Sequence, residues 1–139
     1  MTTMPTEIAE GGQATLDAMQ RMRDASLPEE ERFTSDFTDH DPGAGQPAGP
    51  TGMAWFWEQF GAAFSDLDRD VIETIVTPTN FITIMNLSGT HTGEYFGHAP
   101  TGKRFTVRNV QVVGFRDGKV SDRWGSTDEL GILQQLGLV

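Results

Sequence analysis

The chain has 139 residues, and its ten Lys and Arg against twenty Asp and Glu give a formal net charge of −10. This charge disfavours binding to nucleic-acid backbones and to anionic membrane surfaces. There is no cysteine, so disulfides and thiolate metal sites are excluded, and no signal peptide or apolar run of transmembrane length is visible. We therefore expect a soluble, cytoplasmic protein with a single domain at residues 13–139.

Two helices are predicted near the N-terminus, after a flexible tail at residues 1–12 that is polar and unpatterned. Apolar side chains recur at helical spacing over residues 13–25, which predicts an amphipathic helix. Pro28, followed by three glutamates, predicts the start of a second, short helix. Phe33 and Phe37 are four residues apart, so we expect them on the buried face of this second helix.

A loop is predicted at residues 39–50, which contain three prolines and three glycines. His40 stands at its start, between two aspartates. One interpretation is a solvated loop histidine. The other is that the loop folds over a pocket mouth and His40 faces inward, where it would contact substrate.

Residues 51–64 predict the best-defined helix, because aromatic side chains recur there at three- and four-residue spacing. Thr51 is expected to cap its start. Such a face is most simply core, but a helix packed into a curved sheet also forms one wall of a pocket. Phe56, Trp57 and Phe60 are therefore candidates for substrate contact.

The second half of the chain predicts a meander of antiparallel strands. The expected strands are residues 71–77, 81–88, 90–96, 104–115 with a bulge, and 119–124, and a final helix is expected at residues 129–136. Helices followed by strands predict an α+β domain, with the N-terminal helices packed across the concave face of a curved antiparallel sheet. The wide end of such a cone is a natural small-molecule pocket.

The polar segment Gly89–Lys103 lies between two of these strands and holds His91 and His98. Strand edges and the loops that follow them often carry site residues, although the same glycines and proline also suit simple turns. We expect His91 to point into the cone and His98 to be a loop residue. No two of the three histidines form a tight pair such as His-x-His or His-x-x-x-His, so no metal site is predicted.

Several segments, in the right order, resemble the SnoaL-like polyketide cyclase group of the nuclear-transport-factor-2-like (NTF2-like) superfamily. They are Phe37–Pro42, Phe64–Leu67, Gly89–Lys103, Asp117–Val120 and the ending from Asp128 to Gln135-Leu136-Gly137. The likeness covers residues 33–139. It implies the NTF2-like cone and a homodimer or homotetramer formed through the outer sheet face, with which Val110, Val112 and Phe115 are compatible.

In the cyclases of that group an acid near the C-terminal end is the general acid/base of an intramolecular aldol closure, and the resemblance places Asp128 there. Aldol closure needs a base and a hydrogen-bond donor to the oxyanion. It requires neither a metal nor an organic cofactor. Apolar walls would make the carboxylate a stronger base, and His91 would orient it or polarise a carbonyl. Asp128 also suits the N-cap of the last helix, and both roles can coexist.

Asp122 and Trp124 share one face of the last strand. If that face is inward, Asp122 is a second candidate carboxylate and Trp124 a pocket wall. If it is outward, Asp122 is a solvated charge and Trp124 turns towards solvent or a dimer interface. We lean towards the outward placement.

The sequence therefore predicts a cofactor-independent cyclase or isomerase acting on a neutral, largely apolar, polyketide-like carbonyl compound. One alternative is a limonene-epoxide-hydrolase-like enzyme, which needs Asp122 or Glu94 close to Asp128. That enzyme would also place an arginine, such as Arg123 or Arg108, between the carboxylates. A second alternative is a non-catalytic small-molecule binder, in which no titrating group faces the ligand.

Overall fold

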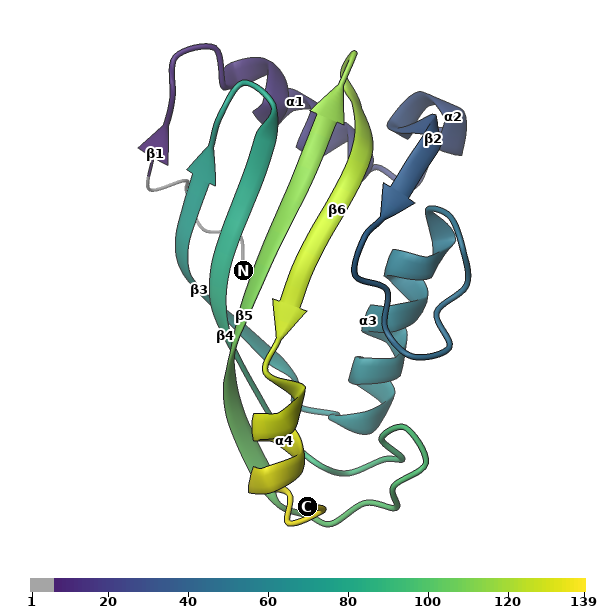
Figure 1. The fold of residues 1–139 in the computed structure, drawn as a ribbon, viewed down its shortest axis with the longest axis vertical. Coiled ribbons are helices and arrows are strands. Elements are labelled where there is room, and N and C mark those ends of the chain that lie inside the picture. The colour runs from purple at the N-terminus through teal and green to yellow at the C-terminus, as the bar shows by residue number, and fades with distance from the viewer. Residues whose placement is uncertain (1–6) are drawn as a thin grey trace.

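β-branched and alternating residues build four long strands, which curve around one helix in a computed structural model describing residues 7–139 (Figure 1). The elements are β1 (Glu7–Ile8), α1 (Gln13–Met22), α2 (Glu29–Arg32), β2 (Phe33–Asp39), α3 (Thr51–Ala63), β3 (Asp68–Val76), β4 (Asn80–Thr90), β5 (Arg104–Arg116), β6 (Lys119–Thr127) and α4 (Glu129–Gln135). The predicted α+β class and cone-like fold are confirmed. None of the helices described is long and apolar enough to cross a membrane.

The sheet has the strand order β1-β3-β4-β5-β6-β2. The four central strands pair antiparallel, as predicted, and the register between β5 and β6 shifts at Gly114/Phe115, which confirms a bulge. The two edge strands come from the N-terminal segments and pair parallel, β1 with β3 and β2 with β6. The expectation of a purely antiparallel sheet is thus wrong at both edges.

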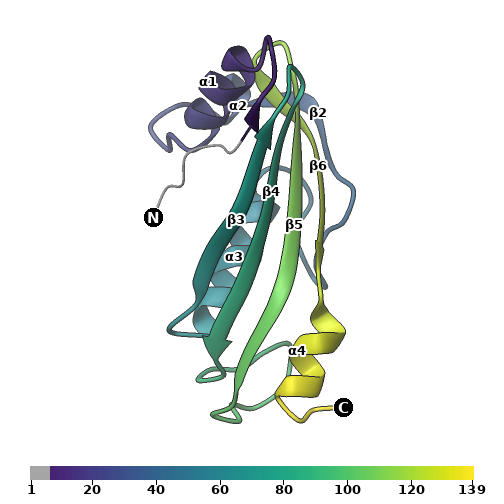
Figure 2. The same cartoon turned by 90° about the vertical axis from the view of Figure 1, so that its left-hand side faces the viewer.

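The helices cover the sheet unevenly. Figure 2 shows α1 and α2 at one end of the sheet, α4 at the other, and α3 along the concave face. α3 packs across that face as predicted, and α1 covers it at one end. Phe56 and Phe60 of α3 join an aromatic cluster, while Ala18 and Met19 of α1 join a second cluster that contains inward residues of the sheet.

The side chains of β5 alternate between the two faces of the sheet, and this alternation positions the site. Phe105 and Val107 face inward to the α3 cluster, and Val113 and Phe115 face inward to the α1 cluster. The inward positions between them, 109 and 111, are polar. A band of polar side chains therefore crosses the interior of the sheet between two apolar cores. Phe115 belongs to the core, so its assignment to the outer face is wrong.

Some local predictions are wrong for identifiable reasons. Phe33 and Phe37 lie on β2 rather than on a helix, because α2 stops after four residues and Phe33 pairs with Val120. Residues 91–103 make only isolated bridges and form a loop, since glycines and a proline interrupt them. Pro50, without a side-chain hydrogen bond, takes the N-cap position of α3 that was expected for Thr51.

The predicted N-terminal tail falls partly on structured residues. Glu7 and Ile8 pair with β3 as strand β1. Residues 1–6 lie outside the described part of the chain.

Candidate functional site

The inward face of β6 presents Arg123 to the polar band. The register with β5 places Arg123 opposite Val113 and Gly125 opposite Gln111, all on the concave side. Arg123 forms a buried ion pair with Asp39: the side chain of Arg123 is 9% exposed, and that of Asp39 is 7% exposed. A charge removed from water to this degree must be paired and hydrogen-bonded to be tolerated.

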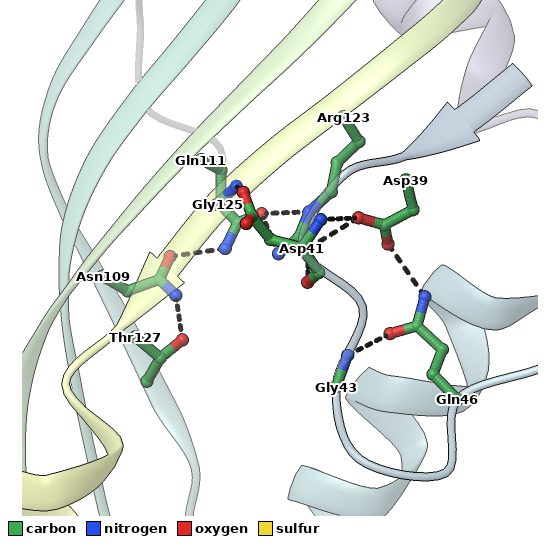
Figure 3. A network of polar contacts seen from close by, with 9 residues as sticks. All are labelled: Asp39, Asp41, Gly43, Gln46, Asn109, Gln111, Arg123, Gly125 and Thr127. Atoms are coloured by element: carbon green, nitrogen blue, oxygen red, sulfur yellow. Dashed lines mark hydrogen bonds and ion pairs between the residues drawn. The ribbon is translucent and has the colours of Figure 1, made fainter.

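The guanidinium of Arg123 makes four hydrogen bonds (Figure 3). Nη1 donates to Oδ1 of Asp39 at 3.1 Å and to the backbone carbonyl of Asp41 at 2.7 Å. Nε and Nη2 both donate to Oε1 of Gln111, at 2.9 and 2.7 Å. A guanidinium has five N–H donors. One donor on Nη2 therefore has no protein partner among residues 7–139.

The network continues on both sides of the arginine. Gln111 donates to Oδ1 of Asn109 at 3.0 Å, and the fully buried Asn109 donates to the hydroxyl of Thr127 at 2.6 Å. On the other side, Gln46 donates to Oδ2 of Asp39 at 2.8 Å and accepts from the backbone N–H of Gly43 at 2.9 Å. The 39–50 loop is therefore tied to the sheet through a buried ion pair.

The position of the Arg123 guanidinium requires a glycine at residue 125. A Cβ atom at this residue would lie 2.5 Å from Nη2 of Arg123 and 2.8 Å from Oε1 of Gln111. The missing side chain lets the guanidinium lie over the strand.

A polar hollow of about 260 Å³ opens beside this network. Arg123, Gly125 and Thr127 of β6, Asp41 of the loop, Phe56 of α3 and Glu129 of α4 contribute to its wall. Asp41 accepts a hydrogen bond from the backbone N–H of Gly125 at 3.0 Å through Oδ2. Its Oδ1 has no hydrogen-bond partner in the described structure. The residues that bear the unpaired carboxylate oxygen and the unpaired guanidinium donor, Asp41 and Arg123, thus both line this hollow.

Asp128 is exposed and caps α4, accepting a hydrogen bond from the backbone N–H of Gly131 at 2.9 Å. The predicted capping role is confirmed. Its neighbours Thr127 and Glu129 line the hollow, whereas Asp128 does not. A catalytic role for Asp128 remains a prediction.

His91 is fully buried, so the inward placement is confirmed. The backbone N–H of Thr101 donates to Nδ1 at 3.1 Å, which puts the proton of the neutral ring on Nε2. Nε2 is buried against aromatic rings and has no hydrogen-bond partner in the described residues. The hydrogen bond between His91 and Thr101 holds the 91–103 loop in place. No described contact joins His91 to Asp128.

His40, Asp122 and Trp124 form a cluster on the outer face of β6. The His40 and Trp124 rings stack 4.6 Å apart, and Nε2 of His40 lies 2.9 Å from Oδ1 of Asp122. Hydrogen bonds from His40 and Ser121 lower the pKa of Asp122. The outward placement of Asp122 and Trp124 is confirmed. The expectation that His40 faces a pocket is wrong, because the ring stacks on this outer face.

The expected aromatic pocket wall is largely core. Phe60 is fully buried and packs against Phe56, Phe64 and Tyr95, so aromatic rings fill the space under α3. Trp57 lies under the guanidinium of Arg69, at 4.2 Å. Of the three aromatic candidates, Phe56 alone lines the polar hollow.

Sequence reasoning missed most of the residues that form the network. Asn109 and Gln111 carried a usable signal, since they are polar side chains at inward positions of an otherwise apolar alternation. Asp39, at the end of β2, and Gln46, in the loop that follows, carried none, because both are far from β5 and β6 in sequence. Within residues 7–139, no three His, Asp or Glu side chains are placed to hold a metal ion.

A curved, unclosed sheet with a helix on its concave face and a hollow beside the sheet places this chain in the NTF2-like class. Comparison with known proteins is more specific: the model of the SnoaL-like polyketide cyclase family matches residues 8–136. The chain belongs to this family. The expectation of a cyclase-type enzyme is confirmed at the level of the family.

The relatives agree with this assignment. The chain is 39% identical over 51 residues to aklanonic acid methyl ester cyclase AcmA of Streptomyces galilaeus, a match spanning 37% of this chain and 35% of that protein. A polyketide cyclase candidate from Bacillus cereus superposes with a TM-score of 0.72 at 22% identity, covering 100% of this chain and 97% of the other. IdmH of Streptomyces antibioticus, another polyketide cyclase candidate, gives a TM-score of 0.63 at 25% identity, covering 93% and 99%.

Proposed function

We propose that this protein closes a ring within a polyketide-like carbonyl substrate by an intramolecular aldol addition, without a cofactor. The observation that carries the proposal is the juxtaposition in one polar hollow of Arg123, with a free N–H donor, and Asp41, with a free carboxylate oxygen. Aldol chemistry needs these two functions, a base and a donor to the developing oxyanion.

The proposed step is balanced within the substrate and the protein. Asp41 removes a proton from the carbon alpha to one carbonyl, and that carbon forms a new bond to a second carbonyl carbon of the same molecule. The π electrons of the second carbonyl move to its oxygen, which is protonated by the acid form of Asp41. The product is an isomer of the substrate.

Arg123 stabilises the negative oxygen in this step through its free Nη2 donor. The hydroxyl of Thr127 accepts from Asn109 and keeps its own proton for donation, so it supplies a second donor in the same hollow. The buried network fixes the guanidinium before substrate binds. Preorganised donors of this kind contribute about 10²–10³ in rate each.

Asp41 is preferred over two other carboxylates. Asp128 directs its side chain to the backbone of α4, outside the hollow. Glu129 also lines the hollow, but Asp41 is hydrogen-bonded to the network. Its backbone carbonyl accepts from Arg123, and its carboxylate accepts from the backbone N–H of Gly125. A substrate that covers the hollow would exclude water from the Asp41 carboxylate.

The alternative of an epoxide-hydrolase-like enzyme gains no support. Asp122 lies on the outer face of β6, Glu94 is exposed, and Arg123 pairs with Asp39 instead of bridging either to Asp128.

The test is ring closure of aklanonic acid methyl ester, the compound that names the relative AcmA, followed by chromatography as a product of unchanged mass. We expect Asp41→Asn to slow closure at least about 100-fold. The matched control is Asp128→Asn, which retains a good N-cap residue and should stay within a few-fold of the wild type. Loss of activity in Asp128→Asn together with an active Asp41→Asn would reverse the assignment.

A further inference from the structure

A second hollow, of about 290 Å³, lies between α3, the 44–45 segment of the loop and the 94–97 turn. Its wall includes three aromatic residues, Trp55, Tyr95 and Phe96. The ring-closing step assigns no role to any of them.

Phe96 is held in an unfavourable backbone conformation. Tyr95 and His98 exchange backbone hydrogen bonds of 3.0 and 2.9 Å around a two-residue turn. Both central residues of that turn have positive φ, +43° at Phe96 and +86° at Gly97. Such turns favour Asn, Asp or Gly at the first central position, so phenylalanine does not stabilise the turn.

Core packing explains Phe96 only in part, since its ring packs edge-on against the buried Tyr95 at 4.9 Å but the residue is 40% exposed. A strained backbone that presents an exposed aromatic ring at the wall of a hollow points to a binding role. Trp55, which is half-buried on α3, provides an aromatic surface in the same hollow.

The two hollows adjoin. Ala44 belongs to the wall of both. Tyr95 of the second hollow has its pKa raised by burial and by the charge of Glu129, which lines the first hollow. One elongated ligand can therefore occupy both.

We propose that the second hollow is a subsite for a flat apolar ring of the substrate, bound by Trp55 and Phe96 while the reacting carbonyl lies at Arg123. This rests on the proposed function. Phe96 and Trp55 are then specificity-determining residues.

The probe for the subsite is 2-naphthylmethanol, a neutral bicyclic ring without a carbonyl, titrated against nitrogen-15-labelled protein by NMR. We expect saturable shifts of the backbone amides of Gly45 and Gly97 in the wild type. Phe96→Asn removes the ring while placing a favoured residue in the turn, so it should fold and bind about fivefold to tenfold more weakly. The control Ile72→Asn removes an exposed apolar side chain outside the hollow and should bind like the wild type.

The outcomes separate this inference from the proposed function. No binding at Gly45 and Gly97, or equal affinity of wild type and Phe96→Asn, overturns the subsite whatever the ring-closure assay shows. Weaker binding by Phe96→Asn supports the subsite as a ring-binding site. If aklanonic acid methyl ester is cyclised, the same variant should raise KM with little change in kcat, and a fall in kcat alone would contradict a binding role.

Discussion

On each of its two faces β6 contributes one member of a close pair between a basic side chain and a carboxylate, and the two pairs are built differently. On the inner face, Arg123 and Asp39 are 3.1 Å apart, with side chains 9% and 7% exposed. On the outer face, His40 and Asp122 are 2.9 Å apart, with side chains 38% and 31% exposed. The distance between the charged atoms is similar in the two pairs, so the pairs differ in how far their surroundings shield them from water.

The inner pair has all but one of its remaining hydrogen-bonding groups satisfied by Gln46, Gln111 and the backbone, the exception being one Nη2 donor of Arg123. The outer pair is open to solvent, where salt and water screen it. A buried pair held by several hydrogen bonds keeps its geometry, and this is what a site that must stabilise a developing charge requires. The inner face is therefore the one on which we propose chemistry, and we expect the outer pair to contribute at most local stability.

The largest expected effect is that of Arg123→Gln. It leaves Asp39 as a buried carboxylate without its cation, which should cost about 3–5 kcal/mol of unfolding free energy. Urea unfolding at neutral pH measures it. The double variant Asp39→Asn/Arg123→Gln removes both charges and should recover part of the loss. A cost below about 1 kcal/mol for the single variant would place the inner pair in the same class as an exposed one.

Gly125→Ala should disturb the inner face without removing a charge. The new methyl group would collide with Arg123 and Gln111, and overpacking of this kind costs about 1–3 kcal/mol. The matched control is Gly61→Ala on α3, where no atom lies within 4 Å of the added Cβ. That change should stabilise the helix by about 0.5–1 kcal/mol. Equal effects of the two substitutions in thermal unfolding would show that the guanidinium does not need the space at Gly125.

The outer pair should give the smallest effect and a defined pH dependence. Asp122→Asn should cost no more than about 1 kcal/mol at neutral pH. The pKa of Asp122 is lowered in the folded protein, mainly by His40, so its contribution is present above the unfolded pKa of about 3.9. It is lost as the pH falls through the lowered value.

The measurement is urea unfolding of wild type and Asp122→Asn between pH 7 and pH 3. We expect the difference between them to shrink towards zero at the acid end. A difference that grows on acidification would contradict the sign of the lowered pKa.

Much of the fold could be predicted because its signals are local. Helical spacing identified α1 and α3, alternation identified the central strands, and Asp117-Gly118 identified the β5–β6 hairpin. The spacing of Phe33 and Phe37 led to a wrong prediction of a helix, since a spacing of four residues places two side chains on one face of a strand as well as of a helix. Only pairing with β6, which is distant in sequence, distinguishes the two.

The site was less accessible to sequence reasoning for the same reason. Asp39 and Arg123 are 84 residues apart, and no local pattern links them. Asp128 was singled out by the family resemblance, while Thr-Asp before an apolar segment also suggested an N-cap, and capping is what the structure shows. Arg123 was considered only as a bridge between other carboxylates.

The most direct test of the central claim uses dimedone, a cyclic diketone that is an enolate at neutral pH and mimics the charge formed during ring closure. Its affinity for the wild type and for Asp41→Asn can be measured by NMR titration of the Gly125 amide. If Arg123 and Asp41 share one hollow, the enolate will bind there, and removal of the Asp41 charge will tighten binding by about tenfold. Equal affinities, or shifts centred on Asp128 and His91 instead of Gly125, would contradict the account.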